Sequence, residues 1–116
     1  MAYLDELRSI ASQLPGTTED VKWGADLCFC VGGKMYTVVG LDSEHTSLKV
    51  PEPVFEEMVT RKGVVPAPYL ARNKWIAFEG TQAFTLEEIA KLMRGSHQLI
   101  LSKLPKKVQR QLAAIP

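Results

Sequence analysis

LCFCVGGKMYTVVGLDSEHTSLKV, residues 27–50, is the stretch that decides the fold of this 116-residue chain. It contains three extended apolar runs joined by two short polar turns, at residues 27–31, 35–41 and 46–50. The dipeptide Gly32-Gly33 predicts a tight hairpin turn, because both central positions of such a turn require positive φ. Apolar and polar residues alternate in the third run, so one face of that strand is expected to be wet. The first run is apolar at every position and indicates a central or covered strand.

Helices are predicted around this meander from apolar residues at helical spacing, over residues 4–14, 51–61, 86–104 and 106–114. A capping box, Thr85 with Glu88, marks the start of the longest helix. His97 lies on its apolar stripe and is expected to be a hydrogen-bonded interface residue. Residues 17–20 are interpreted as a polar connection, residues 64–70 as an irregular edge strand and residues 74–79 as a strand. The order α-β-β-β-α-β-β-α predicts an α+β fold of two layers, with helices packed on an antiparallel sheet, in a single domain of residues 1–116.

Composition places the chain among ordinary globular domains, with 46% apolar and 23% charged residues. No apolar run approaches the roughly 18 residues that cross a bilayer, and the acidic, amphipathic N-terminus is unlike a signal peptide. A cytoplasmic protein without a membrane partner is therefore expected. Cys28 and Cys30 are predicted to be small buried hydrophobic residues. Because His45 and His97 stand at unrelated spacings, neither a zinc site nor any other metal or cofactor is expected.

The net charge of +1 conceals an uneven distribution along the chain. Residues 1–60 carry four Lys/Arg against ten Asp/Glu, whereas residues 91–116 carry six Lys/Arg and no acidic residue. Basic ends often meet phosphates or acidic partners. The same residues would also suit the dipole of a last helix and the solubility of the protein. Both interpretations remain open at this point.

Two hairpin tips, residues 32–34 and 42–45, are candidate contacts for nucleic acid. Lys34 follows two glycines, whose backbone amides could approach a phosphate closely. Lys49, at the far end of the meander, is a further candidate. Asp42 and Glu44 in the second tip would repel DNA, and polar tips are common on loops that simply face solvent.

A second candidate is the basic and aromatic segment of residues 69–75. Arg72, Lys74 and Trp75 could hold a phosphate and stack a base. Alternatively the segment is an anchored loop, with Trp75 in the core and Arg72 paired to Glu19 or Asp20. Catalysis has little support, because no His or Lys is placed by spacing to complete an acid–base pair with the carboxylates of residues 19–26.

Seven short stretches stand in an order and spacing that match a known family: LPGTTED (14–20), KWG (22–24), VGGKM (31–35), SLK (47–49), PAPYLAR (66–72), KW (74–75) and SKLPKK (102–107). In these stretches, which extend over essentially the whole chain, the sequence resembles the MmcQ/YjbR family. The resemblance implies an α+β fold of the secretion-chaperone type and a DNA-binding role through a double wing. It supplies no catalytic residues.

Three functions are consistent with the sequence. The first is a non-catalytic DNA-binding protein that uses Lys34, Lys49, Arg72, Lys74 and Trp75. The second is a small protein-interaction or adaptor module, in which a sheet face or an open strand edge contacts a protein partner. The third is a small-molecule pocket between Trp23, Tyr69 and Trp75, although Trp23 could equally be a lid on the core. The sequence does not predict an oligomeric state.

Overall fold

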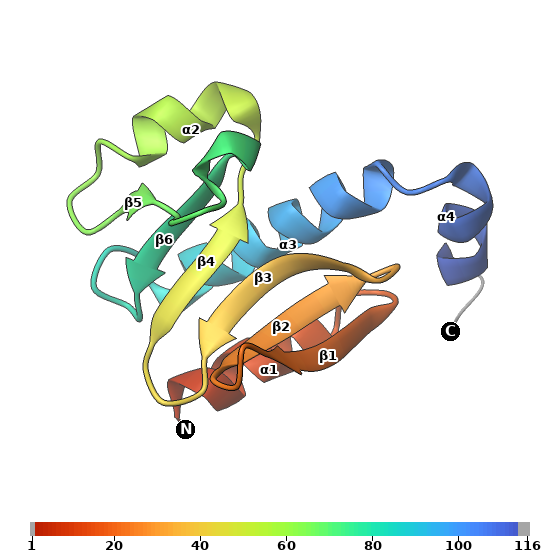
Figure 1. The fold of residues 1–116 in the computed structure, drawn as a ribbon, viewed down its shortest axis with the longest axis horizontal. Helices are drawn as coiled ribbons and strands as arrows, with labels where there is room; N and C mark the ends of the chain where they lie inside the picture. The colour runs from red at the N-terminus through yellow and green to blue at the C-terminus, as the bar shows by residue number, and fades with distance from the viewer. Residues whose placement is uncertain (1, 114–116) are drawn as a thin grey trace.

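The computed structural model describes residues 2–113. Its helices and strands are α1 (Tyr3–Ser12), β1 (Thr17–Lys22), β2 (Asp26–Val31), β3 (Lys34–Gly40), β4 (His45–Lys49), α2 (Glu52–Met58), β5 (Val65–Pro66), the 3-10 helix η1 (Ala71–Asn73), β6 (Trp75–Glu79), α3 (Leu86–Ser102) and α4 (Lys106–Ala113). The strands form one open sheet in the order β1-β2-β3-β4-β6-β5 (Figure 1), and all pairs are antiparallel. The predicted α+β fold is confirmed. Residue 114 of the predicted tail helix lies outside the described residues.

The interpretation of residues 17–20 as a connection is wrong, because they belong to β1. This strand pairs with β2 along its whole length, from Thr17 opposite Val31 to Lys22 opposite Asp26. Since β1 is the edge of the sheet, its four central residues are exposed. The sequence TTEDVK therefore lacks the apolar alternation by which a half-buried strand is recognised.

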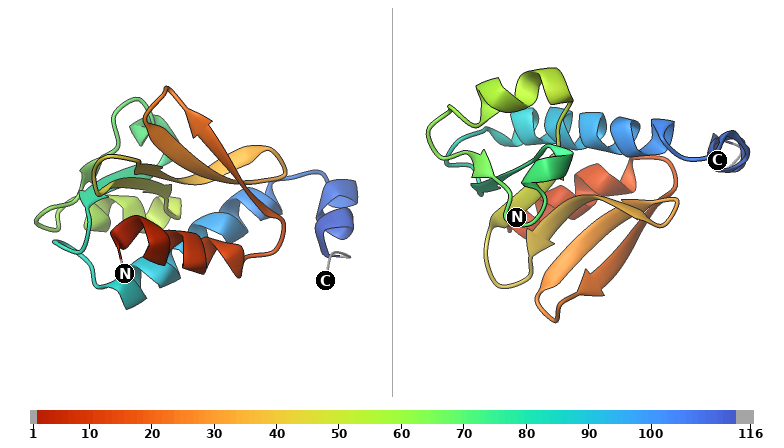
Figure 2. Two further views of the ribbon diagram at one scale, coloured as in Figure 1. Left: turned by 90° about the horizontal axis from the view of Figure 1, so that it is seen from below. Right: turned by 45° about the horizontal axis from the view of Figure 1, so that its top comes forward.

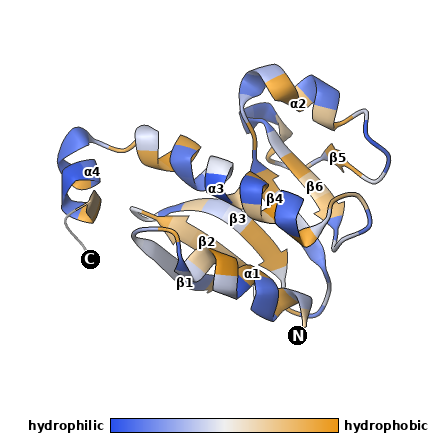
Figure 3. Ribbon diagram, turned by 180° about the vertical axis from the view of Figure 1, so that it is seen from behind, coloured by the Kyte–Doolittle hydropathy of each residue, from blue (hydrophilic) through white to orange (hydrophobic). Residues whose placement is uncertain are grey.

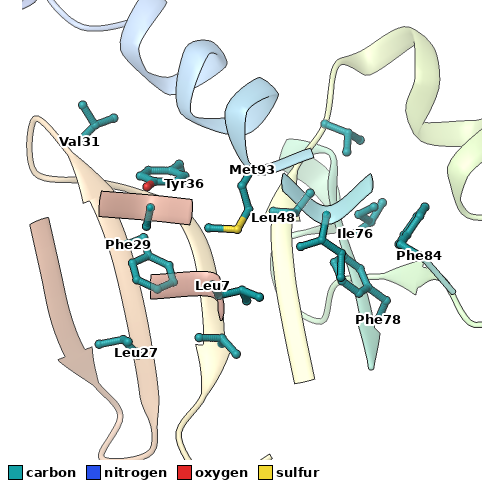
Figure 4. Packing of buried hydrophobic residues seen from close by; sticks show 14 of the residues in the cluster. Leu7, Leu27, Phe29, Val31, Tyr36, Leu48, Ile76, Phe78, Phe84 and Met93 are labelled. Carbon is teal, nitrogen blue, oxygen red and sulfur yellow. The ribbon is translucent and has the colours of Figure 1, made fainter. Parts of the chain in front are cut away.

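The main core lies between one face of the sheet and the helices α1 and α3, which lie on the same side (Figure 2). Apolar residues appear as orange stretches on these helices and along β2 and β6 in Figure 3. Leu7, Phe29, Tyr36 and Met93, from α1, β2, β3 and α3, are buried completely and point toward one another (Figure 4). This face of the sheet supplies the apolar burial that drives folding.

Polar groups that the sequence indicated fix the start of α3 and its buried face. The Thr85 hydroxyl accepts from the amide of Glu88 at 3.1 Å, and the Glu88 carboxylate accepts from the amide of Thr85 at 2.9 Å. That backbone hydrogen bond lowers the pKa of Glu88. His97 is buried, and its Nε2 donates to the carbonyl of Pro15 at 2.8 Å. The predicted capping box and interface histidine are both confirmed.

Ser96 joins β3 to β4 at the point where these strands separate. Their pairing ends with Thr37 opposite Leu48, so Tyr36 and Lys49 would form the next pair. The Ser96 hydroxyl, completely buried on α3, donates to the carbonyl of Tyr36 and accepts from the amide of Lys49 at 3.1 Å. One side chain therefore satisfies two backbone groups that the ladder no longer pairs.

The second face of the sheet, here called the outer face, carries a smaller apolar cluster. Ser47 of β4 is buried there, so the expectation that one face of this strand is wet is wrong at Ser47. Ala67, Trp75 and Ala77 are buried there, and Met35, Val38 and Leu70 pack against them. Cys28 and Cys30 are buried free thiols, as predicted. Burial raises the pKa of Cys28 to about 11. None of the helices between residues 2 and 113 combines the length and apolar character needed to cross a membrane.

Replacing Ser96 with alanine is expected to lower the free energy of unfolding by about 2 kcal/mol, because a buried carbonyl and a buried amide both lose their partner. The matched control is Ser102→Ala, since the Ser102 hydroxyl is exposed and donates only to Leu99 within its own helix. We expect a change within about 0.5 kcal/mol for the control. Urea denaturation, monitored by circular dichroism, measures the free energy of unfolding of both variants. Equal effects would contradict the bridging role of Ser96.

Two buried threonines are expected to respond to valine in opposite directions. The Thr37 hydroxyl has no hydrogen-bond partner within the described part of the chain, so Thr37→Val should raise the free energy of unfolding by about 1 kcal/mol. The Thr46 hydroxyl is 2.6 Å from the hydroxyl of Tyr3 and 3.1 Å from the carbonyl of Glu44. Thr46→Val should therefore lower the free energy of unfolding by about 1–2 kcal/mol. Thermal unfolding of the two variants distinguishes them, and a loss of stability in both would refute the assignment for Thr37.

Candidate functional site

Two hollows lie next to each other and share Met35 and Leu70 as a common wall. We call them the aromatic groove and the lysine hollow. The aromatic groove has a volume of about 470 Å³ and is lined by Trp23, Asp26, Met35, Val38, His45, Ser47, Pro68, Tyr69 and Leu70. The lysine hollow has a volume of about 380 Å³ and is lined by Lys34, Met35, Lys49, Leu70, Asn73, Trp75, Ile100, Lys103 and Leu104.

Two large aromatic side chains at the aromatic groove are turned toward solvent. Trp23 is 70% exposed and Tyr69 is fully exposed, whereas the other tryptophan, Trp75, is 4% exposed. The interpretation of Trp23 as a lid on the core is therefore wrong. Exposed side chains of this size contribute little to packing.

The backbone at both aromatic residues is in the left-handed region, with φ of 54° at Trp23 and 65° at Tyr69. Lys74 is the third non-glycine residue with positive φ among residues 2–113. This conformation costs a side-chain-bearing residue of order 1 kcal/mol or more, and strained positions cluster at functional sites. Trp23 lies in the turn between β1 and β2, directly before Gly24. The fold therefore holds two exposed aromatic side chains beside one groove on strained turns.

The polar side chains of the aromatic groove are Asp26, His45 and Ser47. His45, at the start of β4, has its Nδ1 2.8 Å from Oε1 of Glu79 on the neighbouring strand β6. The imidazole ring of His45 therefore has a carboxylate as its partner. No Lys or Arg lines this groove. Its fixed charge comes from the carboxylate of Asp26.

The lysine hollow brings together three cations from distant parts of the chain. Lys34 begins β3, Lys49 ends β4 and Lys103 caps the end of α3. No carboxylate from residues 2–113 lines the hollow. Burial, together with the nearby charges of Lys103 and Lys74, lowers the pKa of Lys49, while the carboxylate of Glu52 opposes that shift. The ammonium of Lys49 donates to the carbonyl of Asn73.

The structure separates the residues that the sequence grouped as a nucleic-acid contact. Lys34, Lys49 and Trp75 line the lysine hollow, where the buried Trp75 forms part of the wall and presents no open face to a base. The ammonium of Lys74 lies 5.0 Å from the centre of the Phe55 ring. Arg72 is exposed on η1 and does not line the hollow.

The alternative in which Arg72 pairs with Glu19 is wrong. Glu19 instead accepts two hydrogen bonds from Arg8 of α1, both at 3.0 Å. Of the pocket residues expected from the sequence, Trp23 and Tyr69 meet at the aromatic groove, whereas Trp75 belongs to the neighbouring hollow. Asp26, His45 and Lys103 were not assigned to a site, because their convergence depends on strand register and on where α3 ends.

The first hairpin tip is exposed, but one side of it contacts the end of α3. A Cβ placed on Gly32 would lie 2.5 Å from Cδ1 of Leu104, which shows how closely the turn approaches the end of α3. This contact places Lys34 beside Lys103. The second tip, with Asp42 and Glu44, is exposed. Within residues 2–113, no cluster of three His, Cys, Asp or Glu residues could hold a metal ion.

A family model described as YjbR matches residues 12–99, which is most of the chain. The structure is similar to the crystal structure of Deinococcus radiodurans protein DR2400, a DUF419 protein, at 26% identity and a TM-score of 0.86, over 95% of this chain and 87% of that one. A protein from Pseudomonas syringae has the same fold at 20% identity and a TM-score of 0.68, over 82% of this chain and 96% of that one. None of the curated proteins matches the chain. By its sequence and its fold, the chain belongs to the YjbR family.

Proposed function

We propose that this YjbR-family protein is a non-catalytic DNA-binding protein that holds the phosphate backbone at the lysine hollow. The observation that carries the proposal is the convergence of Lys34, Lys49 and Lys103 around a surface that no carboxylate lines. Phosphate contacts of this kind provide most of the affinity of non-specific DNA binding.

The electrostatics of the hollow favour an anionic ligand. Burial is the largest cause of the lowered pKa of Lys49, and the neighbouring charges of Lys103 and Lys74 add to it. A phosphate placed among the three lysines would relieve the repulsion between these charges, because an opposite charge within a few ångströms favours the charged form. The protein surface also offers further cations next to the hollow.

Those further cations continue the positive surface beyond the end of α3. Lys106 and Lys107 open α4 and are exposed, and residues 91–116 contain no acidic residue. Lys74, which caps η1, is close enough to Lys49 to contribute to its lowered pKa. DNA bound at the hollow would therefore meet further cations toward α4, whereas Glu52 is a carboxylate near Lys49.

The double variant Lys34→Gln/Lys103→Gln is expected to weaken DNA binding and to reduce its dependence on salt. Each lost phosphate contact lowers the slope of log K against log salt by about 0.9 for duplex DNA and about 0.7 for single strands. Fluorescence anisotropy with labelled duplex and single-stranded oligonucleotides, at low and moderate salt, measures affinity and slope for both forms.

The control is Lys62→Gln/Lys91→Gln, which removes the same charge from two exposed lysines outside the hollow. Lys91 lies about 18 Å along α3 from Lys103, at 1.5 Å per residue. Weaker binding only in the hollow variant would support the proposal. Equal weakening in both variants, or no binding by the unmodified protein at low salt, would refute it.

A further inference from the structure

We propose that the aromatic groove is a second binding site, for a small organic cation in which an ammonium group is joined to an apolar or aromatic body. This inference is independent of DNA binding, because no residue with a positive side chain is shared between the two hollows. It depends on the size of the groove, on its charge and on its two exposed aromatic rings.

The groove has the dimensions and the lining of a small-molecule site. Such sites typically have volumes of about 300–1,000 Å³, with mainly apolar walls and a few placed polar groups. Here the volume is about 470 Å³, and Met35, Val38 and Leu70 supply apolar walls. Asp26 adds a carboxylate, which attracts an ammonium group through its charge, and Ser47 adds a hydroxyl.

The charge of the groove selects a cation over an anion. Asp26 takes part in none of the three ion pairs among residues 2–113, which join Arg8 to Glu19, His45 to Glu79 and Arg61 to Glu88. Its carboxylate therefore remains available to a ligand. Lys22 of β1 lies opposite Asp26 across the strand pair, and no ion pair among the described residues joins the two side chains.

The aromatic rings provide the second attraction for a cation. The faces of tryptophan and tyrosine carry negative potential, and they attract an ammonium ion within about 6 Å of the ring centre. Trp23 and Tyr69 both line the groove and both are exposed. Both residues also have a left-handed backbone. Carboxylate, tryptophan and tyrosine around one apolar groove form a site that matches an aromatic or alkyl ammonium ion.

Benzyltrimethylammonium is a suitable probe, with benzyl alcohol as its neutral counterpart and benzoate as its anionic one. The chain has two tryptophans, so two indole N–H signals report on binding in proton–nitrogen correlation spectra of the labelled protein. Trp23→Phe identifies the signal of Trp23. We expect the cation to shift the Trp23 signal saturably, and to shift it more than the signal of the buried Trp75. Benzyl alcohol and benzoate are expected to bind at least about threefold more weakly than the cation, which is the effect of an exposed ion pair.

Asp26→Asn is expected to weaken binding of the cation about threefold or more, because it removes the carboxylate and keeps the shape of the side chain. Asp5→Asn is the matched control, since Asp5 is an exposed residue of α1 that does not line the groove. Unchanged dispersion of the spectra establishes that both variants are folded.

The proposal is overturned if benzyl alcohol or benzoate binds as tightly as the cation, which would leave an apolar groove without charge selection. It is also overturned if Asp26→Asn and Asp5→Asn bind the cation equally well, or if no probe shifts the Trp23 signal. DNA affinity, measured separately, has no bearing on any of these outcomes.

Discussion

The hydroxyl of Ser96 bridges the two halves of the sheet at the point where their strands separate. Strands β1, β2 and β3 form one half and β4, β6 and β5 the other, and only three residue pairs join β3 to β4. Beyond Thr37 and Leu48, the carbonyl of Tyr36 and the amide of Lys49 are bridged by Ser96. Buried backbone groups without partners are costly, so the separation of the strands requires this residue of α3.

The lysine hollow lies where β3 and β4 are no longer paired. Lys34 and Met35 of β3 and Lys49 of β4 line it, together with Ile100, Lys103 and Leu104 from the end of α3. The long aliphatic stems of lysine can cover apolar surface while their ammonium groups remain near water. Lys49 is partly buried in this position, and that burial is the largest cause of its lowered pKa.

The sequence predicts the elements that depend on local patterns. The Gly32-Gly33 turn, the capping box of α3 and the apolar stripe containing His97 follow from short-range chemistry, and all three are present. An edge strand such as β1 has no apolar face to bury, so periodicity does not distinguish it from a loop.

The candidate site was only partly predictable, for a different reason. The sequence shows that Trp23 and Tyr69 are large aromatic residues near turns, which allowed them to be grouped. Their exposure to solvent is a property of the folded chain. Lys103 joins Lys34 only because Leu104 packs against Gly32, which is a tertiary contact.

The antiparallel register explains why the two hollows differ in charge. Asp26 lies opposite Gly40 at one end of the β2–β3 pair, and Val31 lies opposite Lys34 at the other. In the next half of the sheet, β4 begins with His45 opposite Glu79 and ends with Lys49 opposite Trp75. Acidic positions therefore collect at one end of these strands and lysines at the other. A slip of one residue would turn Asp26 and Lys49 to the opposite face, so the same register that buries the core also sorts the charges of both hollows.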